Sequence, residues 1–174
     1  MVWRRLFVVG FVIFIPGCSA LYTTSPRYRQ VRQIKPKKQT PAVVRHPMEE
    51  KKGRLPWPVA GNVISNFGVQ VEPKYGTKTK NLGIDISCKR NSPVKAIWKG
   101  TVSYADVFMG QGLMVILEHG GGYYSVYSRL EEIKVNSGQK VEAGETLAFS
   151  GPVLHFELRI GGTAVDPMEW LERR

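Results

Sequence analysis

The stretch Val153-Leu-His-Phe-Glu-Leu-Arg-Ile160, close to the end of the chain, predicts a β-strand. It is a short run rich in apolar residues, and the Gly and Pro residues on either side are typical of turns that bound a strand. Alternate side chains of a strand point to the same face of a sheet. Residues 153 and 155 are therefore expected side by side on one face.

Similar short runs recur from Leu55 to the end of the chain and indicate many short strands. They are rich in β-branched residues and punctuated by Gly, Pro and Asn. Besides 153–160, the predicted strands are residues 62–67, 83–87, 94–97, 101–105, 113–118, 123–127 and 146–149. Residues 167–171 suggest a helical turn, with Asp166 as its cap and Pro167 at its first position. The sequence thus predicts an all-β domain, an antiparallel sheet or sandwich with a short C-terminal helical turn.

The first 17 residues have the composition of an export signal. Two arginines precede an apolar run at residues 6–15, which is shorter than the roughly 20 residues that a membrane-spanning helix needs. The sequence Ile15-Pro-Gly-Cys18 resembles the lipobox of bacterial lipoproteins, which predicts a signal peptide at 1–17 and lipidation of Cys18. The alternative is an ordinary signal peptide followed by an incidental cysteine. Lipidation would leave Cys88 unpaired, so no disulfide framework is implied.

Positive charge is concentrated before the predicted domain. The 174-residue chain has a formal net charge of +11. Residues 18–56 contain ten Lys or Arg against two Asp or Glu, whereas residues 57–174 contain thirteen against twelve. A nearly neutral domain argues against a nucleic-acid partner. We expect residues 18–56, which include His46, to be a basic disordered tether, and residues 57–174 to be the folded domain. The tether either holds anionic wall polymer or lipid headgroups or is only a solvated linker.

Two segments of the domain carry possible metal ligands, Asn81-Leu-Gly-Ile-Asp85 and Val153-Leu-His-Phe-Glu-Leu158. Together with further matches between residues 57 and 171, they resemble the LytM or lysostaphin-type zinc metallopeptidases, which cut peptidoglycan cross-bridges. The other matching segments are Pro93-Val-Lys-Ala96, Gly100-Thr-Val102, Tyr127, Gly138 to Val141, Ala143-Gly144 and Val165-Asp-Pro167. The resemblance implies the antiparallel LytM fold, of the duplicated hybrid motif type, and a zinc site with three protein ligands and an open position.

The resemblance also marks positions at which this chain departs from active members of the family. Those members read His-x-x-x-Asp in the first segment and His-x-His in the last. Here Asp85 and His155 are retained, whereas Asn81 and Val153 stand where histidines are expected. Arg129 replaces a further histidine two residues after Tyr127.

Each replacement weakens a zinc peptidase. The amide oxygen of Asn81 is a poor zinc donor compared with imidazole, and Val153 cannot transfer a proton. If Arg129 points into the groove, its charge opposes a cation and favours Asp85 as its partner. We therefore expect no catalytic residue, no bound metal and loss of zinc binding. Phe149-Ser-Gly-Pro152 runs almost directly into the last strand, which predicts a shortened groove wall and a wider cleft. For His119, beside three glycines, a structural role is favoured over a ligand role.

The resemblance is strongest to degenerate LytM factors of the EnvC and NlpD type, which activate N-acetylmuramoyl-L-alanine amidases during cell separation. It implies that the vacant groove binds a periplasmic amidase, that peptidoglycan is a second partner, and that the lipid anchor binds a membrane. The expected contact residues are Asn81, Asp85, Tyr127, Arg129, Val153 and His155. Ser19 beside Cys18 implies the periplasmic face of the outer membrane. Two alternatives stay open: a passive peptidoglycan-binding scaffold lipoprotein, and an active zinc endopeptidase with a rearranged site.

Overall fold

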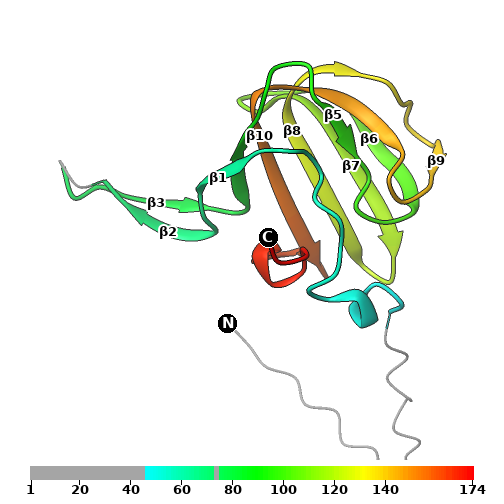
Figure 1. Ribbon diagram of the computed structural model, residues 1–174, viewed down its shortest axis with the longest axis horizontal. Helices are drawn as coiled ribbons and strands as arrows, with labels where there is room; N and C mark the ends of the chain where they lie inside the picture. Colours follow the sequence, from blue (N-terminus) through cyan, green and yellow to red (C-terminus); the bar gives the residue numbers. More distant parts are fainter. Residues whose placement is uncertain (1–45, 73–74) are drawn as a thin grey trace, which may run out of the picture. The chain divides into compact units, whose positions relative to one another are not determined.

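The computed structural model of the protein describes residues 46–72 and 75–174 (Figure 1). The predicted signal peptide, Cys18 and residues 18–45 of the predicted tether lie outside the described residues. Within the described part of the chain, no helix has the length and apolar character needed to cross a membrane.

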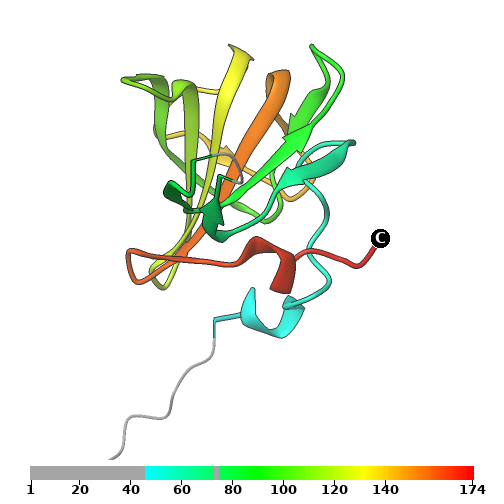
Figure 2. The same cartoon turned by 90° about the vertical axis from the view of Figure 1, so that its left-hand side faces the viewer.

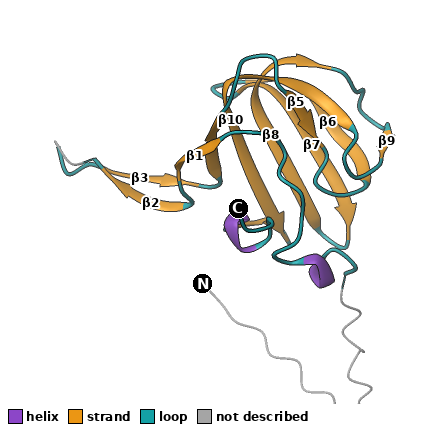
Figure 3. Ribbon diagram, viewed as in Figure 1, coloured by secondary structure: helices purple, strands orange, loops and turns teal. Residues whose placement is uncertain are grey.

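The domain is built on a nine-stranded sheet whose main path is β1-β4-β10-β8-β7-β6-β9, with every strand pair antiparallel (Figure 3). The strands on this path are β1 (Asn62–Ser65), β4 (Ile84–Ser87), β10 (Thr146–Ile160), β8 (Tyr123–Ile133), β7 (Gly112–Gly120), β6 (Gly100–Phe108) and β9 (Lys140–Val141). Two short strands, β5 (Pro93–Lys95) and β11 (Thr163–Val165), pair with β10. The predicted all-β antiparallel fold is confirmed.

Strand β10 pairs with four other strands, β4, β5, β8 and β11, and contains the stretch first singled out in the sequence. The two strands predicted at 146–149 and 153–160 are one continuous strand, bent by a register irregularity around Gly151. A side chain at Gly151 would lie 2.8 Å from the carbonyl oxygen of Arg129, so glycine permits the close approach of β8 here. Residues 149–153 consequently form no projecting loop.

A second, two-stranded sheet forms an arm that projects from the domain beside β1 (Figures 1 and 2). It consists of β2 (Gly68–Val71) and β3 (Lys78–Asn81). Neither strand was predicted, because polar and charged residues dominate β3 and neither strand is buried on both faces. We call residues 68–72 and 75–81 the arm.

The core lies on one face of the main sheet and is apolar, apart from a hydrogen-bonded polar cluster that includes His119 and Ser125. Leu154, Phe156 and Leu158 alternate along β10 and are all fully buried. The ring of His119 is hydrogen-bonded to the carbonyl of Lys99 at 2.8 Å and to the hydroxyl of Ser125 at 2.8 Å. Burial lowers the pKa of His119, against the opposing effect of its backbone hydrogen bond. The structural role predicted for His119 is confirmed.

The described chain starts within the segment that was expected to be a tether. A 3-10 turn, η1 (Glu49–Lys51), is followed by Leu55, which bridges to Leu171 and is 1% exposed, and Met48 before the turn is fully buried. Residues 46–56 therefore differ from the disordered tether expected there. Met48 and Leu55 pack the segment against the core. Two apolar side chains are too few to give the segment a periodic pattern.

His46, which was assigned no role, fixes the start of this segment. Its ring stacks on Tyr123 with centroids 4.5 Å apart, and its Nε2 atom lies 3.0 Å from the carbonyl oxygen of His119. At the other end of the chain, η2 (Pro167–Glu169) forms the predicted helical turn. Asp166 caps it by accepting a hydrogen bond from the amide of Met168 at 2.9 Å. Both turns lie at the same end of the sheet (Figure 2).

Candidate functional site

Strands β4 and β10 bring the two retained ligand positions together. Asp85 and His155 are directly opposite each other in the antiparallel register, so their side chains share one face of the sheet. This face is opposite to the one that carries the core residues of β10, because strand neighbours alternate. Gly83, just before β4, allows the close approach of the chain to β10, since a side chain there would lie 2.1 Å from the carbonyl oxygen of Phe156.

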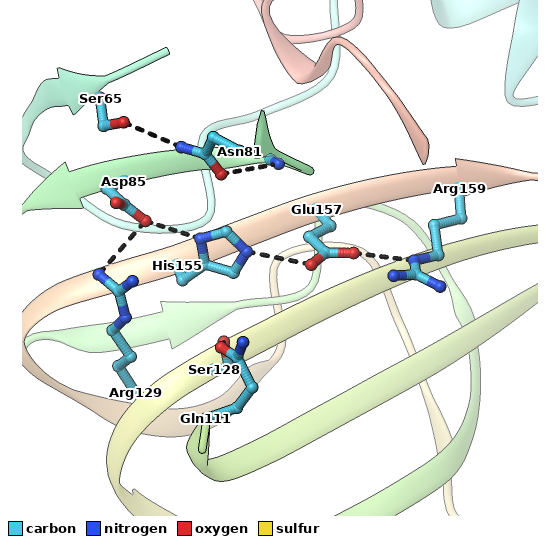
Figure 4. Close-up of polar contacts among 10 residues, drawn as sticks. Ser65, Asn81, Asp85, Gln111, Ser128, Arg129, His155, Glu157 and Arg159 are labelled. Atoms are coloured by element: carbon cyan, nitrogen blue, oxygen red, sulfur yellow. Dashed lines mark hydrogen bonds and ion pairs between the residues drawn. The ribbon is translucent and has the colours of Figure 1, made fainter. Parts of the chain in front are cut away.

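Five charged side chains form an unbroken chain of ion pairs on this face (Figure 4). Arg129 lies 3.3 Å from Oδ1 of Asp85, which lies 2.6 Å from Nδ1 of His155. Nε2 of His155 lies 3.1 Å from Oε1 of Glu157, whose Oε2 accepts a hydrogen bond from Nε of Arg159 at 2.8 Å. We call these five residues the charge chain. Positive and negative groups alternate along it, so each charge has an opposite neighbour.

The charge chain stabilises the protonated form of His155. Burial disfavours the imidazolium, but hydrogen bonds to Glu157 and Asp85 outweigh burial and raise the pKa of His155. Burial likewise opposes ionisation of Glu157, yet the hydrogen bonds from His155 and Arg159 lower the pKa of this carboxyl. An imidazolium donates from both ring nitrogens, which matches a carboxylate on each side.

The two ends of the charge chain are cations that are more exposed than the anions between them. The side chains of Arg129 and Arg159 are 47% and 37% exposed, against 16% for Asp85 and 9% for Glu157. The surface above the charge chain therefore presents positive charge to solvent. The pairing of Arg129 with Asp85, expected from the sequence if the arginine pointed into the groove, is present.

An unusual backbone conformation holds Arg129 in position. It has a φ of 60°, in the left-handed region that non-glycine residues rarely adopt. It lies where β8 bulges against both neighbours: the register passes from Ser128 to Leu130 on each side without pairing Arg129. Its amide donates instead to the carbonyl of Gln111 at 3.1 Å. Strain of this kind persists where surrounding structure enforces it, and is common at functional sites.

Asn81, at the end of β3, has a structural set of contacts. Its Oδ1 accepts a hydrogen bond from the amide of Gly83 at 3.1 Å, and its Nδ2 donates to the hydroxyl of Ser65 at 3.0 Å. The side chain thereby fixes the turn between the arm and β4. Its oxygen, the only atom of the amide that could bind a cation, thus also accepts a backbone hydrogen bond.

The charge chain borders a hollow of about 300 Å³ between the arm and the main sheet. Four of the six predicted contact residues line it, namely Asn81, Asp85, Arg129 and His155. Tyr127 is not among them, because it is fully buried on the core face, where the amide of Ile97 donates to its hydroxyl. Val153 shares the face of His155 on β10, two residues away, but does not line the hollow.

A second, more apolar hollow of about 460 Å³ adjoins the first along the same face of the sheet. Both share Leu82, Gln111 and Glu157 as lining residues. Its apolar walls come from β6, β7 and β8 and include Phe108, Met114, Ile116 and Val126. The two hollows together form one groove, polar and positive at one end and apolar at the other.

The part of the chain that contains β4 and β10 matches a known family. The model of peptidase family M23 matches residues 79–167, which include the end of β3, both ligand segments and all of the strands between them. The chain belongs to peptidase family M23. The resemblance seen in the sequence is thereby confirmed, and the domain is called the M23 domain below.

The relatives of the M23 domain include proteins that are named as activators or lipoproteins. The "Murein hydrolase activator EnvC" of Escherichia coli is 36% identical over 129 residues, 70% of this chain and 30% of the relative. The "Lipoprotein NlpD/LppB homolog" of Pseudomonas aeruginosa is 36% identical over 70% of this chain and 41% of the relative. The chain thus spans less than half the length of these curated relatives. A zinc-containing peptidase from Vibrio cholerae has the same fold, with a TM-score of 0.61 and 26% identity over 71% of this chain and 41% of that one.

The donors of this M23 domain do not fit a zinc site in the observed arrangement. Zinc binds a histidine through an unprotonated nitrogen, yet both ring nitrogens of His155 face carboxylates. Oδ1 of Asp85 is shared between His155 and Arg129, and Oδ1 of Asn81 accepts a hydrogen bond from the amide of Gly83. Within residues 46–72 and 75–174, no three His, Cys, Asp or Glu side chains are grouped so as to hold a metal. The loss of zinc binding stays a prediction.

Glu157 and Arg159 belong to the site but were absent from the predicted contact residues. The signal was present in the sequence, because the two residues follow His155 at intervals of two on one strand and must share its face. Gln111, from the turn between β6 and β7, also lines the groove, but no pattern in the sequence predicts this position. It depends on a contact between distant segments.

Proposed function

We propose that this M23 domain is a non-catalytic activator of peptidoglycan amidases, which binds an N-acetylmuramoyl-L-alanine amidase in its groove during cell separation or envelope remodelling. The observation that carries the proposal is the pairing of Asp85 with His155. Asp85 and His155, which stand at two ligand positions of the family, form an ion pair with each other. Asp85 also pairs with Arg129, and a groove remains beside them.

The absence of catalysis is supported by the chemistry of the groove. A zinc hydrolase needs a metal with an open position and a group that transfers protons to and from water and substrate. Asn81 and Val153 cannot replace two histidines in these roles, and the charge of Arg129 opposes a cation. Removing one partner of such a salt bridge also costs free energy, because the other partner would be left as an unpaired charge.

Binding of a protein segment is supported by the two ends of the groove. Apolar side chains such as Met114 and Ile116 offer a surface for aliphatic or aromatic anchors. The exposed guanidinium groups of Arg129 and Arg159 suit an acidic side chain of the same segment. Relatives named as murein hydrolase activators, at 34–36% identity, support a hydrolase as the partner.

The cellular address belongs to the same proposal. Lipidation of Cys18 would fix the protein to a membrane, and relatives named as lipoproteins support an anchored protein of the Gram-negative envelope. Ser19 after the lipidated cysteine favours the outer membrane. The domain would then work at its periplasmic face, where it meets peptidoglycan.

The proposal is tested by dye release from labelled sacculi. The chain from residue 18 onward, with Cys18→Ala to avoid acylation, is added alone and together with candidate periplasmic amidases. We expect no release from the chain alone and a marked increase with a cognate amidase. Release by the chain alone would identify an enzyme. Binding to sacculi without any effect on any amidase would identify a passive wall-binding scaffold.

A further inference from the structure

The arm has two chemically different faces. In its antiparallel register Gln70 is opposite Thr79, and these two residues line the hollow beside the charge chain. Val69 is opposite Lys80 and Val71 is opposite Lys78. Directly opposed residues project to the same face, so these four side chains form the other face of the arm, which we call the outer face. Lys80 is long enough to border the hollow as well.

The outer face exposes apolar and cationic groups together. Val69 is 63% exposed and Val71 is 56% exposed, although valine in a strand is normally covered by a neighbouring layer. Lys78 and Lys80 are exposed beside them. A segment bound in the groove would meet the inner face of the arm and Lys80, so the function proposed above leaves Val69, Val71 and Lys78 without a role.

We propose that the outer face of the arm binds the anionic lipid surface of the membrane to which the protein is anchored. Apolar side chains next to lysines are the combination that binds such surfaces, because the valines enter the headgroup layer while the ammonium groups pair with lipid phosphates. The outer face carries two positive and no negative side chains, so its charge complements that of anionic lipids. This inference rests on the lipid anchor included in the proposed function.

The tether places the arm within reach of that surface. Twenty-seven residues separate Cys18 from His46, and residues 19–45 contain seven Lys or Arg and no Asp or Glu. The coil that the sequence predicts would span on the order of 30 Å, and at most about 90 Å when fully extended. An anchored domain on such a tether meets its own membrane at a high effective concentration, so a weak surface contact is sufficient.

Another exposed apolar region provides a matched control. The end of β6 and the turn that follows it expose Val107 at 62% and Met109 at 93%. This region lacks lysines and follows Asp106, so its charge does not favour an anionic surface. We expect it to contribute little to lipid binding. A difference between this turn and the arm would therefore separate a specific contact from general apolar exposure.

The test is co-sedimentation with vesicles of phosphatidylethanolamine and phosphatidylglycerol, with phosphatidylcholine vesicles as the uncharged comparison. The chain from residue 18 with Cys18→Ala is used, so that no acyl group contributes. We expect the double variants V69S/V71S and K78Q/K80Q each to lower the partition coefficient about tenfold, and the V107S/M109S variant to leave it unchanged. The lysine effect should fade at high salt, because salt screens surface charge.

If both arm variants bound vesicles as tightly as the native chain, the proposal would be overturned, because the tether alone would then account for the binding. An equal loss in V107S/M109S would overturn it as well. If the arm variants lost amidase activation but not vesicle binding, the outer face would be a protein contact instead. The vesicle assay contains no hydrolase, so its outcome is independent of the activator function. Incorporation of labelled palmitate at Cys18 tests the anchor separately.

Discussion

Oδ1 of Asp85 lies 2.6 Å from Nδ1 of His155, across the pairing of β4 with β10. In a zinc peptidase of this family both side chains would point at a metal. Here they point at each other, and Arg129 adds a cation on the outer side of Asp85. The pairing of β4 with β10 thus aligns an ion pair. This relationship underlies four of the predictions below.

Zinc binding should be weak in the native chain and restorable by substitution. The double variant N81H/R129A provides a third ligand and removes the opposing cation. We expect its zinc affinity to exceed that of the native chain at least about tenfold, measured by competition with a chelating dye. The control N136H adds a histidine in an exposed turn and should gain nothing. Tight binding of one zinc per native chain would contradict the expected loss of the site.

Stability should depend on pH through His155 and Glu157. The pKa of His155 is raised above 6.5, so its contribution is present in full below pH 6.5 and is lost as pH rises through the higher, folded-state pKa. The pKa of Glu157 is lowered below 4.5, so its contribution is present above pH 4.5 and is lost as pH falls through the lower value.

Together these shifts predict that the charge chain stabilises the domain most between about pH 4.5 and 6.5. Urea unfolding of the native chain and of H155Q should therefore differ more at pH 6 than at pH 9. H155Q keeps the size and hydrogen-bonding capacity of the side chain but cannot titrate. A difference that grew toward pH 9 would mean that His155 is neutral in the folded protein.

The pairing of β4 with β10 should tolerate no side chain at Gly83. G83A would place a methyl group 2.1 Å from the Phe156 carbonyl oxygen, which forces the two strands apart and misaligns Asp85 with His155. We expect a loss of about 3 kcal/mol or more in the free energy of unfolding. Gly138 has a φ of 86° with nothing within 4 Å, so G138A should cost only about 1–2 kcal/mol. Equal losses would disprove the steric explanation.

The segment before residue 57 should contribute to stability, contrary to the boundary expected from the sequence. Met48 is fully buried, so M48A should cost about 2–4 kcal/mol in urea unfolding. Met168 is 43% exposed, and M168A should cost less than about 1 kcal/mol. If M48A cost no more than M168A, residues 46–56 would belong to the tether after all.

The sequence was sufficient to predict the strands that bury an apolar face and the family to which the domain belongs. It also indicated the cap at Asp166 and the pairing of Arg129 with Asp85, because both follow from local chemistry. The strands of the arm could not be predicted, since a polar, half-exposed hairpin has no apolar alternation to detect.

The remaining differences have a common cause in long-range packing. Tyr127 was expected in the groove because the family motif includes it, but strand alternation places its ring in the core, 5.3 Å from that of Phe156. The attachment of His46 to Tyr123 depends on a contact between residues 77 positions apart, which no local pattern encodes. Such contacts join segments that are distant in the sequence, so a local pattern does not predict them.

The measurement that tests the central claim most directly is amidase activation by Arg129→Ala. Arg129 lines the groove, ends the charge chain and is half exposed, so its loss removes a partner contact without opening the core. Arg90, paired with Glu131 on the surface at 2.8 Å, provides the matched control R90A. In dye release from sacculi, we predict that R129A loses most of the activation while R90A retains it, with both variants folded. Full activation by R129A would contradict the claim that the groove binds the amidase.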